Sequence, residues 1–176
     1  MSEYTPKTSP ERIQILDDNA RKFILGSIDH EFLETHDASS FVMTTDWLST
    51  DEDSETKLAH KAYADDDIKI LRIAKHTVDG KRTSRKEVLT GTQYEEQVGN
   101  SILRLQKTRH ELSYDQDGIM YDVKLDEFTD SRLVMIEVDA PTDEQRALFN
   151  PDIFPAALRE VTGDLNYYGY RVSGVL

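Results

Sequence analysis

The sequence predicts a mainly β domain (α+β, with a few helices), arranged as an antiparallel barrel or a sandwich. Short stretches in which apolar and polar side chains alternate recur along most of the chain. Asp79-Gly80 and Asp117-Gly118 separate neighbouring stretches, and dipeptides of this kind favour tight hairpin turns. The chain has 176 residues, which is enough for one domain with its own core.

In the N-terminal half, residues 1–10 are polar and contain prolines, so we expect a flexible tail there and a single domain over 11–176. A strand is expected over 12–25, with an interruption near residue 18, and a short helix over 29–35. β-branched and aromatic residues favour strands. They predict the next strands at 40–48, 55–63, 68–76 and 82–90.

In the C-terminal half, a helix is expected from Thr92 to about residue 103, because Thr92 and Glu95 have the spacing of a capping box. A later helix is expected to begin at Thr142, a residue type that caps helix N-termini well. The alternation of residue types predicts strands near 105–113, 119–128 and 133–139.

The stretch 133–139 carries two carboxylates in an otherwise apolar strand. Side chains alternate between the two faces of a strand, so Glu137 and Asp139 share a face with Met135, and Ile136 lies on the other face. Burying a carboxylate costs free energy unless a cation, a metal ion or water compensates it. Glu137 and Asp139 therefore either line a polar cavity or lie on a solvated outer face.

The overall charge excludes some partners. The chain has 34 acidic and 21 basic residues, a formal net charge of −13. Nucleic acids and anionic membranes repel such a chain, so neither a nucleic acid duplex nor a membrane is an expected partner. A small anionic ligand fits only if the Lys and Arg residues gather in one place.

The residue composition also bears on metal chemistry and location. The sequence contains no cysteine, which excludes disulfide bonds and thiolate metal sites. No apolar run approaches the ~18 residues of a membrane-spanning helix. Residues 1–5 lack the apolar core of a signal peptide, and we expect the protein in the cytoplasm.

Several expected strands carry charged side chains on one face and apolar side chains on the other. This pattern fits either the outer surface of a soluble sheet or a polar interior, and spacing alone does not decide between them. The charged sets are Lys57 with Lys61, Lys69 with Lys75, Arg85 with Glu87, Lys107 with Arg109 and Glu111, and Asp122 with Lys124 and Asp126.

Four local motifs follow one another in a specific order. They are R-K-F-I-L at 21–25, K-T-R-H-E-L at 107–112, D-E-F at 126–128 with L-V-M-I-E-V-D at 133–139, and E-V-T-G-D at 160–164 followed by Tyr167. In this order and spacing they resemble the motifs of the CYTH family, the triphosphate tunnel metalloenzymes. The resemblance covers roughly residues 15–170.

The resemblance implies an eight-stranded antiparallel β-barrel that forms a tunnel, with a few flanking helices. It also implies a divalent-metal-dependent hydrolase of inorganic triphosphate or a nucleoside triphosphate, present as a monomer or homodimer. In that family, Lys and Arg residues inside the barrel hold the phosphate chain, and carboxylates hold Mg²⁺ or Mn²⁺. Hard divalent ions prefer such oxygen ligands.

Carried over to this chain, the resemblance assigns three sets of site residues. The phosphate-binding residues would be Lys22, Lys57, Lys75, Arg85, Lys107 and Arg109. The metal ligands would be Glu137 and Asp139, with Glu87 and Asp18 as further candidates. Lys107, Arg109 and Asp126 would form the catalytic set, with Asp126 pointing into the tunnel and orienting a basic neighbour.

The chain departs from the family pattern at several positions. Where the family has two glutamates before R-K, this chain has Asp18 and Ala20, so one carboxylate is shortened and one is lost. The strand that usually bears Arg-x-Arg has Lys57 and Ala59, and Asn166 stands at a position that is often basic. Losing a carboxylate should lower the affinity for a divalent metal.

These departures leave alternatives open. One is a catalytically weakened CYTH-fold module that binds a phosphorylated ligand or polyphosphate. A second is an adenylate cyclase, and a third is an interaction protein whose barrel or sandwich has no link to phosphate.

Overall fold

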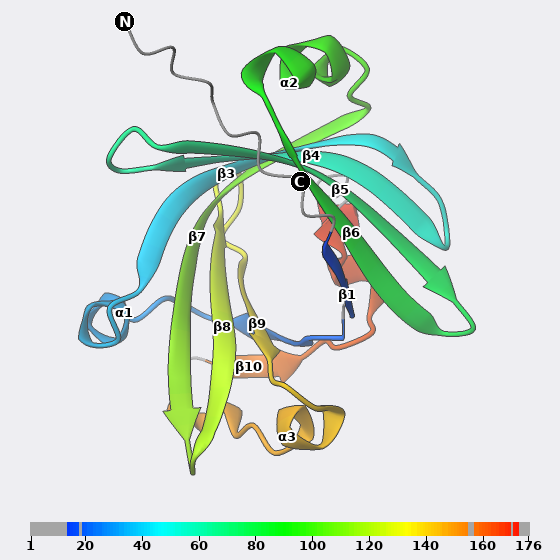
Figure 1. The fold of residues 1–176 in the computed structure, drawn as a ribbon. Coiled ribbons are helices and arrows are strands. Elements are labelled where there is room, and N and C mark those ends of the chain that lie inside the picture. The colour runs from blue at the N-terminus through cyan, green and yellow to red at the C-terminus, as the bar shows by residue number, and fades with distance from the viewer. Residues whose placement is uncertain (1–13, 18, 155–156, 170, 173–176) are drawn as a thin grey trace, which may run out of the picture.

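The computed structural model describes residues 14–17, 19–154, 157–169 and 171–172. Within these residues, ten strands form one antiparallel sheet in the order β1-β6-β5-β4-β3-β7-β8-β9-β2-β10 (Figure 1). The strands are β1 (Gln14–Asp17), β2 (Arg21–Leu25), β3 (Ser39–Thr50), β4 (Ser54–Tyr63), β5 (Ile68–Val78), β6 (Lys81–Leu89), β7 (Leu103–Gln116), β8 (Ile119–Phe128), β9 (Val134–Asp139) and β10 (Ala157–Glu160).

The helices are α1 (His30–Thr35), α2 (Gly91–Val98) and α3 (Asp143–Ala147), with short 3-10 turns at Pro151–Ile153 and Leu165–Tyr167. The prediction of a mainly β fold with few helices is confirmed. The described sheet has ten strands where we expected eight. The expected tail over 1–10 lies outside the described residues.

The sheet must bend strongly because two strands that are adjacent in sequence lie far apart in its order. β1 begins the order and β2 stands next to its other end. Four Cα–Cα steps join Asp17 to Arg21, so these residues lie within about 15 Å of each other. In a flat sheet, eight strand spacings would hold them about 38 Å apart. The sheet therefore curls back toward itself (Figure 1).

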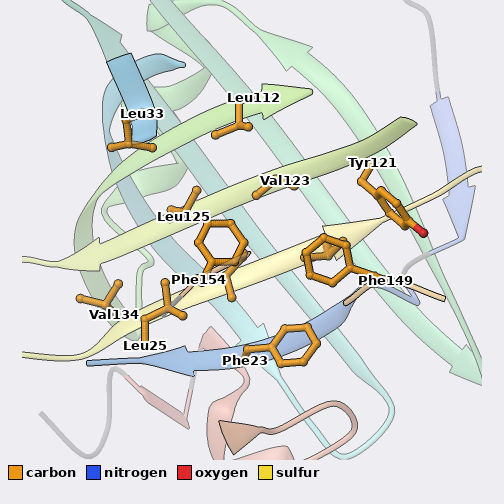
Figure 2. Packing of buried hydrophobic residues seen from close by; sticks show 12 residues of the cluster. Phe23, Leu25, Leu33, Leu112, Tyr121, Val123, Leu125, Val134, Phe149 and Phe154 are labelled. Carbon is orange, nitrogen blue, oxygen red and sulfur yellow. The ribbon is translucent and has the colours of Figure 1, made fainter. Parts of the chain in front are cut away.

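One apolar cluster covers the outer face of β2, β7, β8 and β9. It contains Phe23, Val123, Ile136 and Val138, and these pack against Leu33 of α1 and the segment 149–154 (Figure 2). Ile136 and Val138 are fully buried here, on the face opposite Glu137. The expected alternation of β9 is thus confirmed.

Helix α2 covers the outer face of β3–β6 through Tyr94 and Val98, which pack on Leu58 and Ile70. Buried Asp46 of β3 anchors this region, because it accepts hydrogen bonds from Tyr94 Oη, Ser101 Oγ and Arg104 Nε at 3.0, 3.3 and 2.7 Å.

The start of α2 corrects a prediction. The N-cap is Thr90, whose side chain and that of Gln93 form the capping box, and the helix ends at Val98. Thr92 and Glu95 also match the capping pattern, but Thr92 lies inside the helix. The N-cap of α3 is Thr142, as predicted. No helix in the described part of the chain has the length and apolar character needed to span a bilayer.

Candidate functional site

The inner face of the bent sheet encloses a cavity of about 430 Å³, and every strand from β2 to β9 contributes to its wall. The wall also includes residues near the C-terminus, among them Thr162 and Tyr168. Eight basic side chains line it: Lys22, Lys57, Lys75, Arg82, Lys86, Lys107, Arg109 and Lys124. The acidic side chains in the lining are Glu55, Glu137 and Asp139.

These charges oppose the charge of the whole chain. The protein carries −13 overall, yet basic side chains outnumber acidic ones in the described cavity lining by eight to three. Confinement between protein walls strengthens the attraction that such a cluster exerts on an anion. The condition for a small anionic ligand, that Lys and Arg residues gather in one place, is met.

The charges divide the cavity into two walls. The mixed wall, formed by β2, β7, β8 and β9, carries Lys22, Lys107, Arg109, Lys124, Glu137 and Asp139. The cationic wall, formed by β4, β5 and β6, carries Glu55, Lys57, Lys75, Arg82 and Lys86. Basic side chains are thus in excess on both walls, by four to one on the cationic wall and by four to two on the mixed wall, which carries the carboxylates of β9.

Asp126 organises the base of the mixed wall. Its two carboxylate oxygens accept from Arg109 Nε and Nη2, both at 2.6 Å, and one of them also accepts from Lys107 Nζ. Asp126 is 2% exposed. Burial alone would raise the pKa of Asp126, but the charges of Arg109 and Lys107 outweigh it and lower that pKa.

Glu137 stands between two cations. Its carboxylate lies 3.7 Å from Lys22 Nζ and accepts from Arg109 Nη2 at 3.3 Å. Burial would raise the pKa of Glu137, but Arg109, Lys22 and Lys107 hold it well below its ordinary value. Glu137 is therefore an anion at neutral pH.

Asp139, the second carboxylate of β9, accepts from Arg146 Nε of α3 at 2.8 Å and from the backbone N–H of Ala140 at 2.9 Å. Its side chain is 36% exposed. Asp139 therefore connects the cavity to the helix that follows β9.

Glu55 is the corresponding hub of the cationic wall. It accepts hydrogen bonds from Trp47 Nε1 at 3.1 Å and Lys57 Nζ at 2.9 Å, and it lies 3.5 Å from Arg82 Nη2. Burial would raise the pKa of Glu55, but the charges of Lys57 and Lys75 and these hydrogen bonds lower it to about 2.

The cavity brings together most of the site residues predicted from the sequence. Asp126 does not itself line the cavity, but it binds two residues that do, Lys107 and Arg109. The predicted residues that line the cavity are Lys22, Lys57, Lys75, Lys107, Arg109, Glu137 and Asp139.

Apart from Asp126, three predicted site residues are not in the cavity lining. Arg85 is exposed and half-buried Glu87 lies opposite Arg72, whereas their neighbours Ser84 and Lys86 line the cavity. The prediction placed Arg85 and Glu87 on a shared face, which is correct, but that face is the outer one. Asp18 lies outside the described residues.

Four charged residues of the cavity lining were not among the predicted site residues: Glu55, Arg82, Lys86 and Lys124. A signal existed for two of them. Glu55 stands two residues before Lys57, and Lys124 stands two residues before Asp126, so each shares a face with a residue already predicted to point inward.

Ala20 lines the cavity beside β2, at the position where the resembling family has a carboxylate. Within the described part of the chain, no three or more His, Asp or Glu side chains converge as a metal-binding group. Glu137 and Asp139 are thus the carboxylates on the mixed wall that a metal ion could use.

Comparisons with known proteins find similarity in the fold but not in the sequence. No protein-family model matches the chain, and no curated protein matches it by sequence. Two crystal structures of NE1496 match it in structure, one described as the inorganic triphosphatase NE1496 and the other as the hypothetical protein NE1496. Each has a TM-score of 0.58 and 19% sequence identity, and each match covers 90% of this chain and 94% or 97% of the other.

This chain shares its fold with an inorganic triphosphatase. The resemblance predicted from the motifs is therefore confirmed for the fold. A sequence identity of 19% is too low to show that this chain has the activity of NE1496.

Proposed function

We propose that this protein is a hydrolase of phosphoric anhydrides that holds a linear phosphate chain, such as inorganic triphosphate or the triphosphate of a nucleotide, inside the cavity. We also propose that the bent sheet closes into a tunnel around this cavity. The observation that carries it is the gathering of eight basic side chains in one cavity of a chain with a net charge of −13.

The cationic wall suits a phosphate chain in both charge and shape. Lys75, Lys86 and Arg82 come from neighbouring strands, so their charges are spread along the wall. A chain of phosphates likewise spreads its negative charge along its length. Arg82 can present two N–H groups to one phosphate, whereas the lysines act as point charges.

Glu137 and Asp139 fit a divalent ion that binds together with the phosphates. Mg²⁺ in proteins is commonly held by one or two carboxylates together with substrate phosphates and water. Two carboxylates on one strand supply that set, and a cage made of protein groups alone would need more. When bound, Mg²⁺ or Mn²⁺ would screen the phosphate oxygens and polarise the phosphorus centre.

The chain's own residues would then divide the remaining work. Lys107 and Arg109 line the cavity from β7, and Asp126 of β8 holds both of them through hydrogen bonds. Fixed cations of this kind stabilise negative charge that builds up in the transition state without having to reorganise. Lys22 stands beside Glu137 and would hold a phosphate close to the carboxylates.

A second candidate function is a binding module for a phosphate chain with little or no hydrolysis. The observation in its favour is Ala20, a non-ligating residue in the cavity wall. Fewer carboxylates mean a weaker metal site, and phosphoryl transfer in such a cavity depends on the metal.

Phosphate release from inorganic triphosphate and from ATP, with Mg²⁺ or Mn²⁺, tests the proposal when the wild type is compared with Glu137→Ala. Metal-dependent release that Glu137→Ala abolishes would support the hydrolase. Binding of triphosphate without release would favour the binding module. Formation of cyclic AMP from ATP, followed in the same samples, would instead indicate a cyclase.

A further inference from the structure

Lys57 occupies an unusual position on the cationic wall. Its side chain is 13% exposed and its amine donates to Glu55 Oε1 at 2.9 Å. The amine also lies 5.3 Å from the centre of the Trp47 ring, a contact that favours the charged form. Lys57 thus lines the cavity but is largely shielded from bulk water.

The groups around Lys57 are mostly cations. On its own strand it faces Glu55, and β3 contributes the uncharged Trp47. Glu55 is shared with Arg82, so one carboxylate serves more than one positive charge. Lys75 of β5 and Lys107 of β7 act on Lys57 through their positive charges, and Arg82 and Lys86 of β6 line the same cavity.

This crowding weakens the hold of Lys57 on its proton. Burial, and then the charges of Lys75 and Lys107, lower the pKa of Lys57 to about 8, although Glu55 partly opposes them. About nine in ten Lys57 amines would therefore be neutral at pH 9. An anion placed among these cations would act in the opposite direction.

We propose that the cavity takes up a proton when a phosphate chain binds, and that the amine of Lys57 is the group that accepts it. The bound phosphates supply the negative charge that the crowded cations lack, so the ammonium form of Lys57 becomes the stable one. The proton comes from solvent, and no covalent bond to phosphate forms or breaks. This inference rests on the proposed function because it requires a phosphate chain in the cavity.

The coupling has a definite pH dependence. Well below pH 8 the amine is already protonated and binding takes up almost no proton at Lys57. Near pH 9 the uptake approaches one proton for each bound phosphate chain. Between pH 8 and the higher pKa of Lys57 in the complex, the affinity falls by up to about tenfold per pH unit.

Isothermal titration of inorganic triphosphate measures the uptake directly. The titrations are made without metal at about pH 6.5 and pH 9, each in two buffers with different ionisation enthalpies. The difference in binding heat between the two buffers gives the number of protons taken up on binding. Lys57→Arg is the decisive variant, since Arg keeps its charge at both pH values. Lys69→Arg, at an exposed lysine of β5 outside the cavity lining, is the matched control.

We expect the wild type and Lys69→Arg to take up nearly one proton more at pH 9 than Lys57→Arg does. Triphosphate's own titration is common to all three proteins and cancels in this comparison. Equal uptake in wild type and Lys57→Arg would overturn the inference while leaving phosphate binding intact. No binding at either pH would overturn the proposed function and this inference with it.

A second measurement covers the case in which Lys57→Arg does not fold. In wild-type protein labelled with ¹³C at the lysine Cε, the Lys57 resonance should titrate near pH 8 when free. Saturation with triphosphate should move the midpoint upward by at least one pH unit. An unchanged midpoint would contradict the inference.

Discussion

Arg109 and Asp126 face each other on β7 and β8 as a two-pronged pair, with Nε–Oδ1 and Nη2–Oδ2 distances of 2.6 Å. Asp126 is 2% exposed, so the pair is formed away from bulk water. A buried ion pair contributes little by itself to stability, but removal of one partner leaves an uncompensated charge. In this cavity the pair fixes the direction in which Arg109 points.

Asp126→Asn should therefore destabilise the protein at neutral pH, by about 3–5 kcal/mol in the free energy of unfolding. The size of the side chain is kept, so the loss reports the missing charge. Asp122→Asn is the matched control because Asp122 is exposed on the same strand, and a surface substitution changes stability by less than about 0.5 kcal/mol. Urea unfolding of both variants measures the difference, and equal stabilities would contradict the account.

Glu55 should make the stability depend on pH in the acid range. Its pKa falls from an ordinary 4.5 to about 2 in the folded protein, against the effect of burial and because of Lys57 and Lys75. A carboxyl group with a lowered pKa stabilises the fold above its unfolded pKa and loses that contribution as pH falls through the folded pKa. The contribution is on the order of 3 kcal/mol at neutral pH.

The difference in stability between wild type and Glu55→Gln should thus be full above pH 5 and shrink between about pH 4.5 and pH 2. Other carboxylates titrate in the same range, but they are common to both proteins and cancel in the comparison. Unfolding curves at several pH values measure this difference. A difference that stays constant down to pH 2 would show that Glu55 does not titrate as described.

Ala20→Glu should strengthen divalent metal binding. Ala20 lines the cavity together with Glu137 and Asp139, so a glutamate there can add a third carboxylate. The affinity for Mn²⁺ in the presence of triphosphate should rise by roughly tenfold or more, because ligand charge tunes such sites. Titration of Mn²⁺ followed by electron paramagnetic resonance measures it.

Ala64→Glu serves as the control for the Ala20 variant. Ala64 is exposed after β4, so the same charge is added without reaching the cavity. If both variants bind Mn²⁺ equally, then Ala20 does not lie at the metal-binding end of the cavity.

The sequence predicted the cavity best where one strand carried two kinds of information. In β9, carboxylates alternate with large apolar residues, and the apolar face needs a covering layer. Ile136 and Val138 find that layer under the segment 149–154, which forces Glu137 inward. The two readings left open for Glu137 and Asp139 are resolved in favour of the cavity wall.

The sequence did not predict which face of β6 is the inner one. Both faces of β6 carry polar side chains, so the sequence does not show which of the two faces the cavity. Arg85 and Glu87 were therefore assigned to the site although Arg82 and Lys86 are the residues that line the cavity. The pairing of β6 with β5 places Ser84 opposite Lys75 and so determines which face of β6 is the inner one. This pairing depends on contacts outside β6.

Local sequence patterns also did not predict the number of strands. β1 and β10 are four residues each and pair at the two ends of the sheet. Strands this short carry almost no periodicity of their own. Their place is set by the partners they find once the sheet has bent.

Binding of inorganic triphosphate to Arg82→Gln and Arg85→Gln tests the central claim most directly. The two arginines lie on the same strand, three positions apart, with Arg82 in the cavity wall and Arg85 exposed on the outer face. Calorimetry at neutral pH should show triphosphate binding in the wild type, an affinity at least about tenfold lower in Arg82→Gln and a change of less than about twofold in Arg85→Gln. Equal losses in the two variants, or no binding to the wild type, would contradict a phosphate-binding cavity.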